Sequence, residues 1–124
     1  MPEAAALSVL VVDDQMSIRA LVKQSLMTIG VKHITDAADG EEALRRLTLN
    51  PTHLVISDLT MPRMDGPACL SALRKVLPDA RILVVSALGD RATALKALTH
   101  GAHGFLLKPF SDEQLVGSLE ELIA

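Results

Sequence analysis

The most restrictive feature of this sequence is a regular alternation between short apolar runs and longer stretches with helical spacing. The runs at 7–12 (LSVLVV), 53–57 (HLVIS) and 81–85 (RILVV) are rich in β-branched residues and do not alternate with polar positions. Such runs are typical of strands that are covered on both faces. Two weaker runs, 32–37 and 103–107, fit strands at the edges of a sheet. We therefore predict five strands.

Between these runs, apolar side chains recur at intervals of three and four residues, the spacing of one helical face. The last stretch begins with Ser111 and has Gln114 three residues later, which is the spacing of a capping box. The predicted helices cover 15–29, 40–49, 66–77, 90–100 and 111–123. Strands that alternate with helices in this way predict an α/β fold, a doubly wound (βα)5 parallel sheet in one domain spanning residues 1–124.

Polar and charged side chains stand directly after four of the predicted strands. Asp13 and Asp14 follow the first strand and Asp58 follows the third, while Ser86 and Lys108 follow the fourth and fifth. In open parallel sheets, ligands bind outside the carboxyl ends of the strands. The fold therefore predicts that all five side chains lie together on one rim of the sheet.

Three neighbouring carboxylates are costly unless a positive charge compensates them. At a separation of about 5 Å and an effective dielectric constant of about 20, each pair repels by about 3 kcal/mol. A divalent cation would turn this cost into a binding site, and all-oxygen ligands suit Mg²⁺. The Asp58 carboxylate could then act as a nucleophile toward a phosphoryl group. Lys108 and Ser86 would supply a positive charge and a hydroxyl for the phosphoryl oxygens.

Four sequence motifs extend this interpretation to nearly the whole chain. They are VVDD at 11–14, SDLTMPRMDG at 57–66, VVSA at 84–87 and GAHGFLLKPF at 101–110. On these motifs the chain resembles the bacterial two-component response-regulator receiver domains, of the single-domain chemotaxis-regulator type. The resemblance implies a flavodoxin-like sheet with strand order 2-1-3-4-5. It also implies a phosphoacceptor that assists its own phosphorylation and dephosphorylation, and is not an enzyme that acts on other substrates.

The resemblance assigns roles to the acidic residues and their neighbours. Asp58 would be phosphorylated by a histidine kinase or a histidine phosphotransfer protein. Mg²⁺ would be held by Asp13, Asp14, Asp58 and the backbone carbonyl of Thr60. Thr60 and Leu88 would occupy the two positions that tune the lifetime of the phosphoryl group. Since neither is an amide or an acid that could orient an attacking water, we expect slow self-dephosphorylation.

The same resemblance implies a switch. Ser86 would turn toward the phosphoryl group, and Phe105 would change rotamer with it. Lys108 would pair with the phosphoryl group, and its peptide bond to Pro109 would be cis. The downstream target, which the sequence does not identify, would bind a face made of helix 90–100, strand 103–107 and helix 111–123. This face could also form a phosphorylation-dependent dimer of an otherwise monomeric protein.

Other functions remain open or are disfavoured. A pseudo-receiver that is never phosphorylated usually lacks one of the site residues; none is missing here, and only measurement excludes this alternative. A phosphatase of the haloacid-dehalogenase type needs a second aspartate two residues after the nucleophile, where Thr60 stands. A flavodoxin-like or dinucleotide-binding domain needs a phosphate-binding loop after the first strand, but DDQMS offers two acids and no glycine.

Composition limits the partners and the compartment. The net charge of −3, without a basic run, argues against nucleic acid as a partner. The apolar runs are too short to cross a membrane, and the single cysteine, Cys69, favours a reducing cytoplasm. Because the last predicted helix runs almost to the final residue, we expect a stand-alone receiver without an output domain.

Several side chains also have simpler structural interpretations. Asp14 could be the N-cap of helix 15–29 rather than part of a site. His33 and His53 lie near strand starts and are expected to face solvent on the opposite rim. Phe105 could be an edge-strand residue, and Cys69 is expected to pack in the core.

Overall fold

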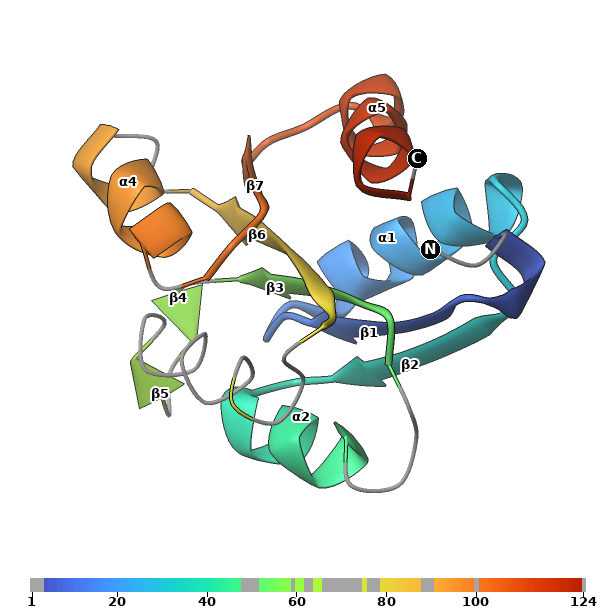
Figure 1. Cartoon of the computed structure of the whole chain (residues 1–124), viewed down its shortest axis with the longest axis horizontal. Coiled ribbons are helices and arrows are strands. Elements are labelled where there is room, and N and C mark those ends of the chain that lie inside the picture. Colours follow the sequence, from blue (N-terminus) through green and yellow to red (C-terminus); the bar gives the residue numbers. More distant parts are fainter. Residues whose placement is uncertain are drawn as a thin grey trace.

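A five-stranded parallel sheet forms the centre of the protein (Figure 1). The computed structural model describes residues 4–47, 52–58, 60–61, 64–65, 75, 79–87, 91–99 and 101–123. The strands are β1 (Ser8–Val12), β2 (His33–Ala37), β3 (Leu54–Asp58), β6 (Arg81–Ser86) and β7 (Gly104–Leu107). Their order in the sheet is β2-β1-β3-β6-β7, with every neighbouring pair parallel. This confirms the predicted strands and the order 2-1-3-4-5, with ends shifted by at most one residue.

Helices cover both faces of this sheet. Helices α1 (Met16–Thr28) and α5 (Asp112–Ile123) lie on one face, and α2 (Gly40–Leu47) lies on the other (Figure 1). Helix α4 (Arg91–Thr99) lies beside β7, and a short 3-10 helix (Ala4–Ala6) precedes β1. The predicted helix 66–77 lies outside the described residues, apart from Lys75. Within the described part of the chain, no helix is long and apolar enough to span a bilayer.

One small element was not predicted. Strands β4 (Thr60–Met61) and β5 (Met64–Asp65) pair antiparallel directly after β3. Thr60 is opposite Asp65, and Met61 is opposite Met64. The segment that follows Asp58 therefore contains a two-stranded ribbon with two residues in each strand. Such short strands give no periodic signal in the sequence.

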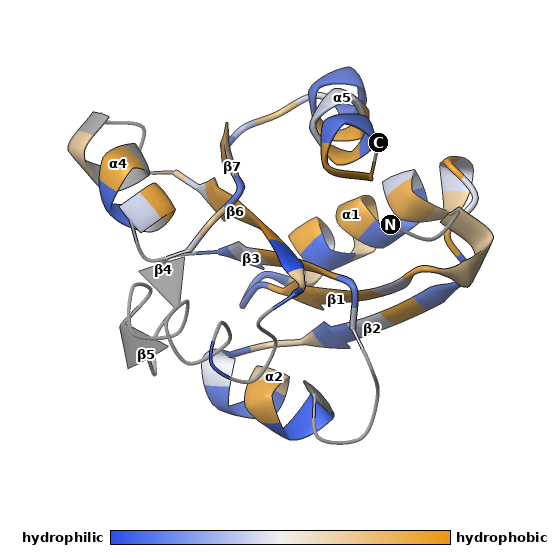
Figure 2. Ribbon diagram, in the orientation of Figure 1, coloured by the Kyte–Doolittle hydropathy of each residue, from blue (hydrophilic) through white to orange (hydrophobic). Residues whose placement is uncertain are grey.

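The central strands are apolar on both faces because each face packs against helices. In β1, Leu10 and Val12 belong to a core cluster that also contains Ala43 of α2. The alternate residues Val9 and Val11 belong to a second cluster with residues of α1 and α5. Figure 2 shows the hydrophobic colouring running along β1, β3 and β6. This two-sided burial is the reason that the strand runs lack polar alternation.

The helix ends follow the expected local chemistry. Ser111 Oγ accepts the Gln114 N–H at 3.1 Å, and Gln114 Oε1 accepts the Ser111 N–H at 2.9 Å, which confirms the capping box. Asp39 Oδ1 accepts the Glu42 N–H at 2.8 Å and caps α2. Gly30 follows α1 with φ of 97°, a left-handed conformation that favours glycine.

Two histidines tie strand ends on the rim opposite the carboxyl ends. His53 Nδ1 accepts the Ser8 N–H at 3.0 Å, and the His53 N–H donates to the Ser8 carbonyl at 2.9 Å. His103 Nδ1 and N–H make the equivalent pair with Ile82, at 3.1 Å and 2.8 Å. The expectation that His53 faces solvent is therefore wrong: the residue is half-buried, and its ring accepts the N–H of Ser8 at the start of β1. His33 is exposed, as expected.

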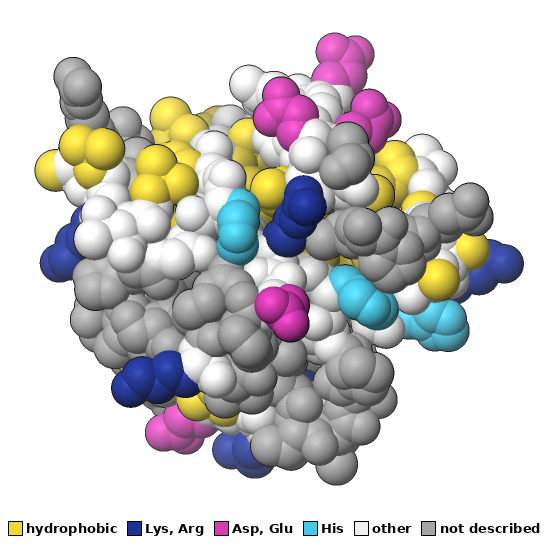
Figure 3. All heavy atoms as spheres, viewed as in Figure 1, with side chains coloured by type: hydrophobic (Ala, Val, Ile, Leu, Met, Phe, Trp, Pro, Cys, Tyr) yellow, Lys and Arg dark blue, Asp and Glu magenta, His cyan; other side chains and the backbone are white. Residues whose placement is uncertain are grey.

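Charge is distributed unevenly over the surface. On the face shown in Figure 3, acidic side chains gather over α5, whereas lysine and arginine side chains lie apart from one another. Helix α5 carries the exposed acids Asp112, Glu113, Glu120 and Glu121. Apolar side chains are visible over α4, where Leu95 and Leu98 are 53% and 46% exposed.

Candidate functional site

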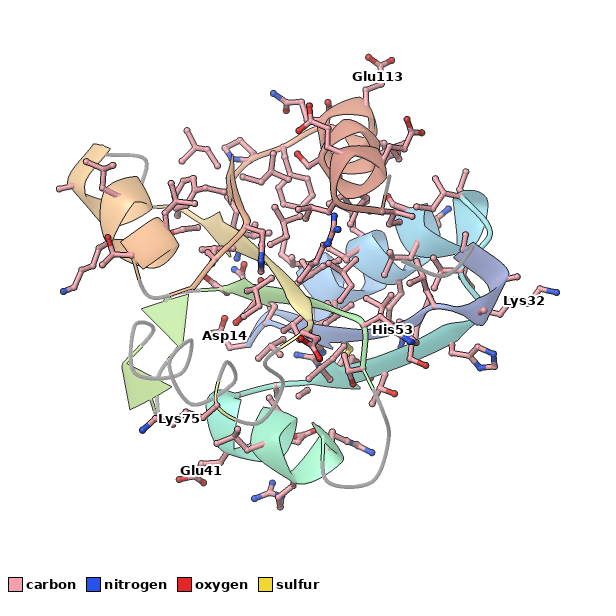
Figure 4. The ribbon with its side chains drawn as sticks, viewed as in Figure 1. Asp14, Lys32, Glu41, His53, Lys75 and Glu113 are labelled. Atoms are coloured by element: carbon pink, nitrogen blue, oxygen red, sulfur yellow. The ribbon has the colours of Figure 1, made fainter. Side chains whose placement is uncertain are left out.

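Three carboxylates from two strand ends meet at the carboxyl rim of the sheet. Asp13 follows β1, and Asp58 is the last residue of β3, the neighbouring strand. Oxygen atoms of Asp13, Asp14 and Asp58 lie within 4.8 Å of one another. Asp13 and Asp58 are only 2% and 5% exposed, whereas Asp14 is exposed. Figure 4 shows Asp14 at this end of the strands and His53 at the other.

Lys108 reaches into the acidic cluster from the end of β7. Its Nζ lies 2.8 Å from Asp13 Oδ2 and 3.0 Å from Asp58 Oδ2, and its side chain is 12% exposed. The backbone supports this position, since the Lys108 N–H donates to the Ser86 carbonyl at 2.8 Å. The Lys108–Pro109 peptide bond is cis, as predicted. One ammonium group therefore neutralises part of the charge of two buried carboxylates.

Burial and pairing act in opposite directions on these charges. Burial raises the pKa of Asp13 above its ordinary 3.8, although hydrogen bonds from Lys108 and the Gln15 N–H partly offset this. Burial also opposes the charged form of Lys108, but its hydrogen bonds to Asp13 and Asp58 outweigh burial and raise the pKa above 10.5. The pKa of Asp13 is therefore raised mainly because the carboxyl group is buried, and the neighbouring charge of Asp58 adds least to the shift.

The loop that carries Asp13 and Asp14 is held by hydrogen bonds that sequence reasoning missed. Asp13 donates its N–H to the Ala37 carbonyl at 3.1 Å, and its Oδ1 accepts the Gln15 N–H at 2.9 Å. Its carbonyl oxygen accepts a bond from Arg19 Nη1 at 2.6 Å. Arg19 lies in the first turn of α1, where a lone arginine gives no sequence signal of a role in a site.

The alternative role for Asp14 as a helix cap is wrong. The N-cap of α1 is Gln15, which makes no side-chain capping bond. The carboxylate that turns back toward the helix start belongs to Asp13, which accepts the Gln15 N–H. Asp14 is thus left to contribute its carboxylate to the acidic cluster. The Gln15 side chain also reaches this rim, with Oε1 3.4 Å from Lys108 Nζ.

The residues predicted to switch lie in β6 and β7, the two strands on one side of the strand that carries Asp58. Ser86 is fully buried as the last residue of β6, opposite Leu107 of β7. Phe105 is half-buried in β7 and packs against the core cluster on the α2 face. The backbone of Thr60 belongs to β4, immediately beyond the end of β3, whereas Leu88 lies outside the described residues. The switching and lifetime-tuning roles of these residues stay predictions.

The donor set fits a hard divalent cation. Mg²⁺ binds oxygen ligands at about 2.1 Å in an octahedron, so opposite ligands lie about 4.2 Å apart. The carboxylate oxygens, within 4.8 Å of one another, are close to that span. When bound, such a cation would neutralise negative charge on both the carboxylates and an incoming phosphoryl group. Asp13, Asp14 and Asp58 are the residues of the described chain that would hold it.

Fold and site together define a class: a doubly wound α/β domain with an acidic, lysine-paired pocket at the carboxyl ends of its central strands. The chain belongs to the response regulator receiver domain family, whose family model matches residues 9–120. Proteins of this family are phosphoacceptors rather than classical enzymes, and they bind Mg²⁺ at an acidic pocket. Phosphorylation and signalling to partner proteins are general properties of the family.

Individual relatives are similar over nearly their full length. A Rhizobium etli protein described as a probable chemotaxis protein CheY is 41% identical over 119 residues, covering 94% of this chain and 92% of that protein. Chemotaxis protein CheY4 of Vibrio cholerae has a TM-score of 0.86 at 33% identity, covering 94% and 99% of the two chains. A chain of the Borrelia burgdorferi CheX-CheY-BeF3-Mg²⁺ complex has a TM-score of 0.89 at 32% identity, covering 95% and 90%.

Proposed function

We propose that this chain is a stand-alone response regulator that accepts a phosphoryl group on Asp58 from a histidine kinase or a histidine phosphotransfer protein. The observation that carries the proposal is the Lys108 ammonium, 2.8 Å from Asp13 and 3.0 Å from Asp58 within a cluster of three carboxylates. Three carboxylates lie around the ammonium of Lys108, and this excess of negative charge would not stabilise a purely structural cluster. A cytoplasmic location is part of the proposal, supported by the single cysteine.

The chemistry assigned to Asp58 is nucleophilic attack on phosphorus. A carboxylate oxygen of Asp58 forms the new bond to phosphorus, while the bond to the nitrogen or oxygen of the donor breaks and the donor leaves. The Asp58 backbone is held by its pairing with Val85 in the ladder, and its carboxylate is held by the hydrogen bond from Lys108 Nζ at 3.0 Å. Lys108 Nζ already contacts Asp58 Oδ2, so it can transfer its hydrogen bond to a phosphoryl oxygen.

The response to phosphorylation is assigned to the side of the sheet nearest α4. Ser86 stands at the end of β6 and Phe105 lies in the adjacent β7, so a change at Asp58 has a short path to this edge. Leu95 and Leu98 of α4 are 53% and 46% exposed, and Leu107 of β7 is 47% exposed. Three exposed leucines on α4 and β7 support a protein-binding surface made of α4, β7 and α5.

The test is incubation of the purified chain with acetyl phosphate and Mg²⁺, followed by intact mass spectrometry. We expect the mass of one phosphoryl group on the wild type and none on Asp58→Asn. Asp79→Asn is the matched control, since Asp79 is exposed and the chemical change is identical. A wild type that gains no phosphoryl group would support the pseudo-receiver alternative. Catalytic turnover of phosphate monoesters would instead support a phosphatase.

The lifetime of the phosphoryl group is a separate part of the proposal. With Thr60 and Leu88 at the tuning positions, we expect slow self-dephosphorylation, followed as decay of the mass adduct. Substituting glutamine at Thr60 and glutamate at Leu88 should shorten the lifetime, because each could orient a water molecule. An unchanged lifetime would remove these two residues from the proposal without affecting the role of Asp58.

A further inference from the structure

Arg19 contacts the acidic loop without belonging to the set of ligands. Its guanidinium spans two elements: Nη1 donates to the Asp13 carbonyl at 2.6 Å, and Nε donates to Asp36 Oδ2 of β2 at 3.0 Å. The Arg19 side chain is 14% exposed, and that of Asp36 is 35% exposed. Lys23, one turn further along α1, places Nζ 3.6 Å from the other Asp36 oxygen. Asp36 is therefore anchored from α1 by two cations.

The orientation of the Asp13 carbonyl affects where the Asp14 carboxylate lies. The carbonyl belongs to the peptide group between Asp13 and Asp14, so its direction sets the plane from which the Asp14 side chain departs. The N–H of Asp13 and both of its carboxylate oxygens have partners within the loop or in Lys108 and Ala37. Among the described residues, Arg19 is the partner that the structure gives to the carbonyl.

Asp14 needs such support because its own side chain has little. Within the described ranges, no hydrogen bond or ion pair is made by the Asp14 carboxylate, which is exposed. Yet its oxygen lies within 4.8 Å of oxygens from the buried Asp13 and Asp58. The backbone must hold it there, and Arg19 is the side chain that bonds to the carbonyl of the Asp13–Asp14 peptide group.

We propose that Arg19 is a positioning residue for divalent cation binding, which acts by fixing the Asp13–Asp14 peptide group and is itself held by Asp36. This inference rests on the proposed function, since it concerns the same Mg²⁺ site. It extends the site to a residue on α1 and a residue on the edge strand β2, neither of which contributes a ligand oxygen.

For the loss of Arg19, the proposal predicts a change in Mg²⁺ affinity opposite to the change expected from charge alone. Arg19 carries a positive charge close to the site, so removing it should strengthen Mg²⁺ binding if charge alone matters. If Arg19 positions the carboxylates, Arg19→Met should weaken binding despite the lost repulsion. Changes to residues that orient metal ligands typically reduce affinity by about 10–100-fold. We expect a loss of roughly ten-fold for Arg19→Met.

The conservative variants separate geometry from charge. Arg19→Lys keeps the charge but has a single ammonium, which cannot bond to Asp36 and the Asp13 carbonyl in the same way as the planar guanidinium. We therefore expect Arg19→Lys to lose affinity as well. Asp36→Asn and Asp36→Ala remove the same charge, but only asparagine keeps an oxygen that can accept from Arg19 Nε. Asp36→Ala should thus bind Mg²⁺ more weakly than Asp36→Asn.

The experiment is calorimetric titration of each metal-free protein with Mg²⁺, because the chain has no tryptophan or tyrosine to report binding. Arg46→Met is the control for charge removal, since Arg46 is exposed on α2 and pairs with Glu42 one turn away. The backbone amide signals of Asp14 and Gln15 in the metal-free NMR spectrum give a second measurement. We expect these signals to shift in Arg19→Met and to remain in place in Arg46→Met.

The outcomes distinguish this inference from the proposed function. If the wild type itself does not bind Mg²⁺, the proposed metal dependence fails. If the wild type binds Mg²⁺ but Arg19→Met binds equally well or more tightly, only the positioning role is overturned. Urea unfolding without metal establishes that each variant folds. If Arg19→Met does not fold, the comparison of Asp36→Ala with Asp36→Asn decides. Equal Mg²⁺ affinities of these two variants would refute the proposal.

Discussion

The ammonium of Lys108 should stabilise the metal-free protein by an amount that substitution can measure. At an effective dielectric constant of about 20, charges at the observed 2.8 Å and 3.0 Å attract by about 6 kcal/mol each. Carboxylates within 4.8 Å of one another repel by about 3 kcal/mol or more per pair. Lys108→Met removes both attractions and leaves the repulsion, in a site where Asp13 and Asp58 are almost completely buried.

The net loss should be smaller than the bare attraction. Burial of Lys108 itself carries a cost that the variant no longer has, and the carboxylates can take up a proton in response. Removing one partner of a buried pair typically costs about 3–5 kcal/mol. We expect Lys108→Met to reduce the free energy of unfolding by about 3–5 kcal/mol in metal-free buffer, measured by urea denaturation near pH 8.

Two comparisons make the result interpretable. Lys32→Met removes the same charge from an exposed position before β2 and should change stability by less than about 0.5 kcal/mol. Saturating Mg²⁺ should bring Lys108→Met closer to the wild type, because the cation can replace the missing positive charge. If Lys108→Met and Lys32→Met unfold at the same urea concentration without metal, the carboxylates do not depend on Lys108 and the electrostatic reasoning is wrong.

Three further predictions concern pH and the frame of the sheet. The pKa of Lys108 is raised above 10.5, so the stability it contributes is complete below that pH and is lost as pH rises through the higher folded value. The difference in unfolding free energy between the wild type and Lys108→Met should therefore shrink in urea titrations above pH 10.5. His53→Ala leaves the Ser8 N–H without its acceptor and should cost about 1–3 kcal/mol. His53→Asn, which places an oxygen where Nδ1 lies, should recover much of this in thermal unfolding, and equal losses would contradict the hydrogen-bond role. Gly30→Ala should destabilise by about 1 kcal/mol because φ is 97°, whereas Gly117→Ala, in open space within α5, should stabilise by about 0.5–1 kcal/mol. Calorimetric melting temperatures that move in the same direction would refute the backbone argument.

Local patterns were sufficient to predict the layout of the sheet. Runs such as LVIS at 54–57 could be assigned to strands because burial on both faces leaves no alternation between polar and apolar positions. Four of the five strand ends then identified candidate site residues, and the acidic cluster with Lys108 forms as expected. The strand order and the cis bond before Pro109 came from family resemblance, since neither has a local signal in the residues themselves.

Contacts between distant segments could not be predicted in the same way. Arg19 looks like an ordinary polar residue on an amphipathic helix, because its partners Asp13 and Asp36 come from two other elements. The two strand-tying histidines were missed for the same reason: His53 was expected to face solvent, yet its Nδ1 bonds to a residue 45 positions away. A hydrogen-bond partner that is remote in sequence leaves no periodic trace.

The place of Asp58 in the sheet has a mechanical consequence. Asp58 belongs to the middle strand of five, and its backbone is paired with Val85 on the neighbouring strand. If Asp58 is phosphorylated as proposed, its backbone would have little freedom to move away from the added group. The displacement has to be taken up by neighbouring parts that are less constrained, and β7 with α4 lies at an open edge of the sheet. Under the proposed function, the sheet would act as a fixed support, and the movement that follows phosphorylation would fall on the edge made of β7 and α4.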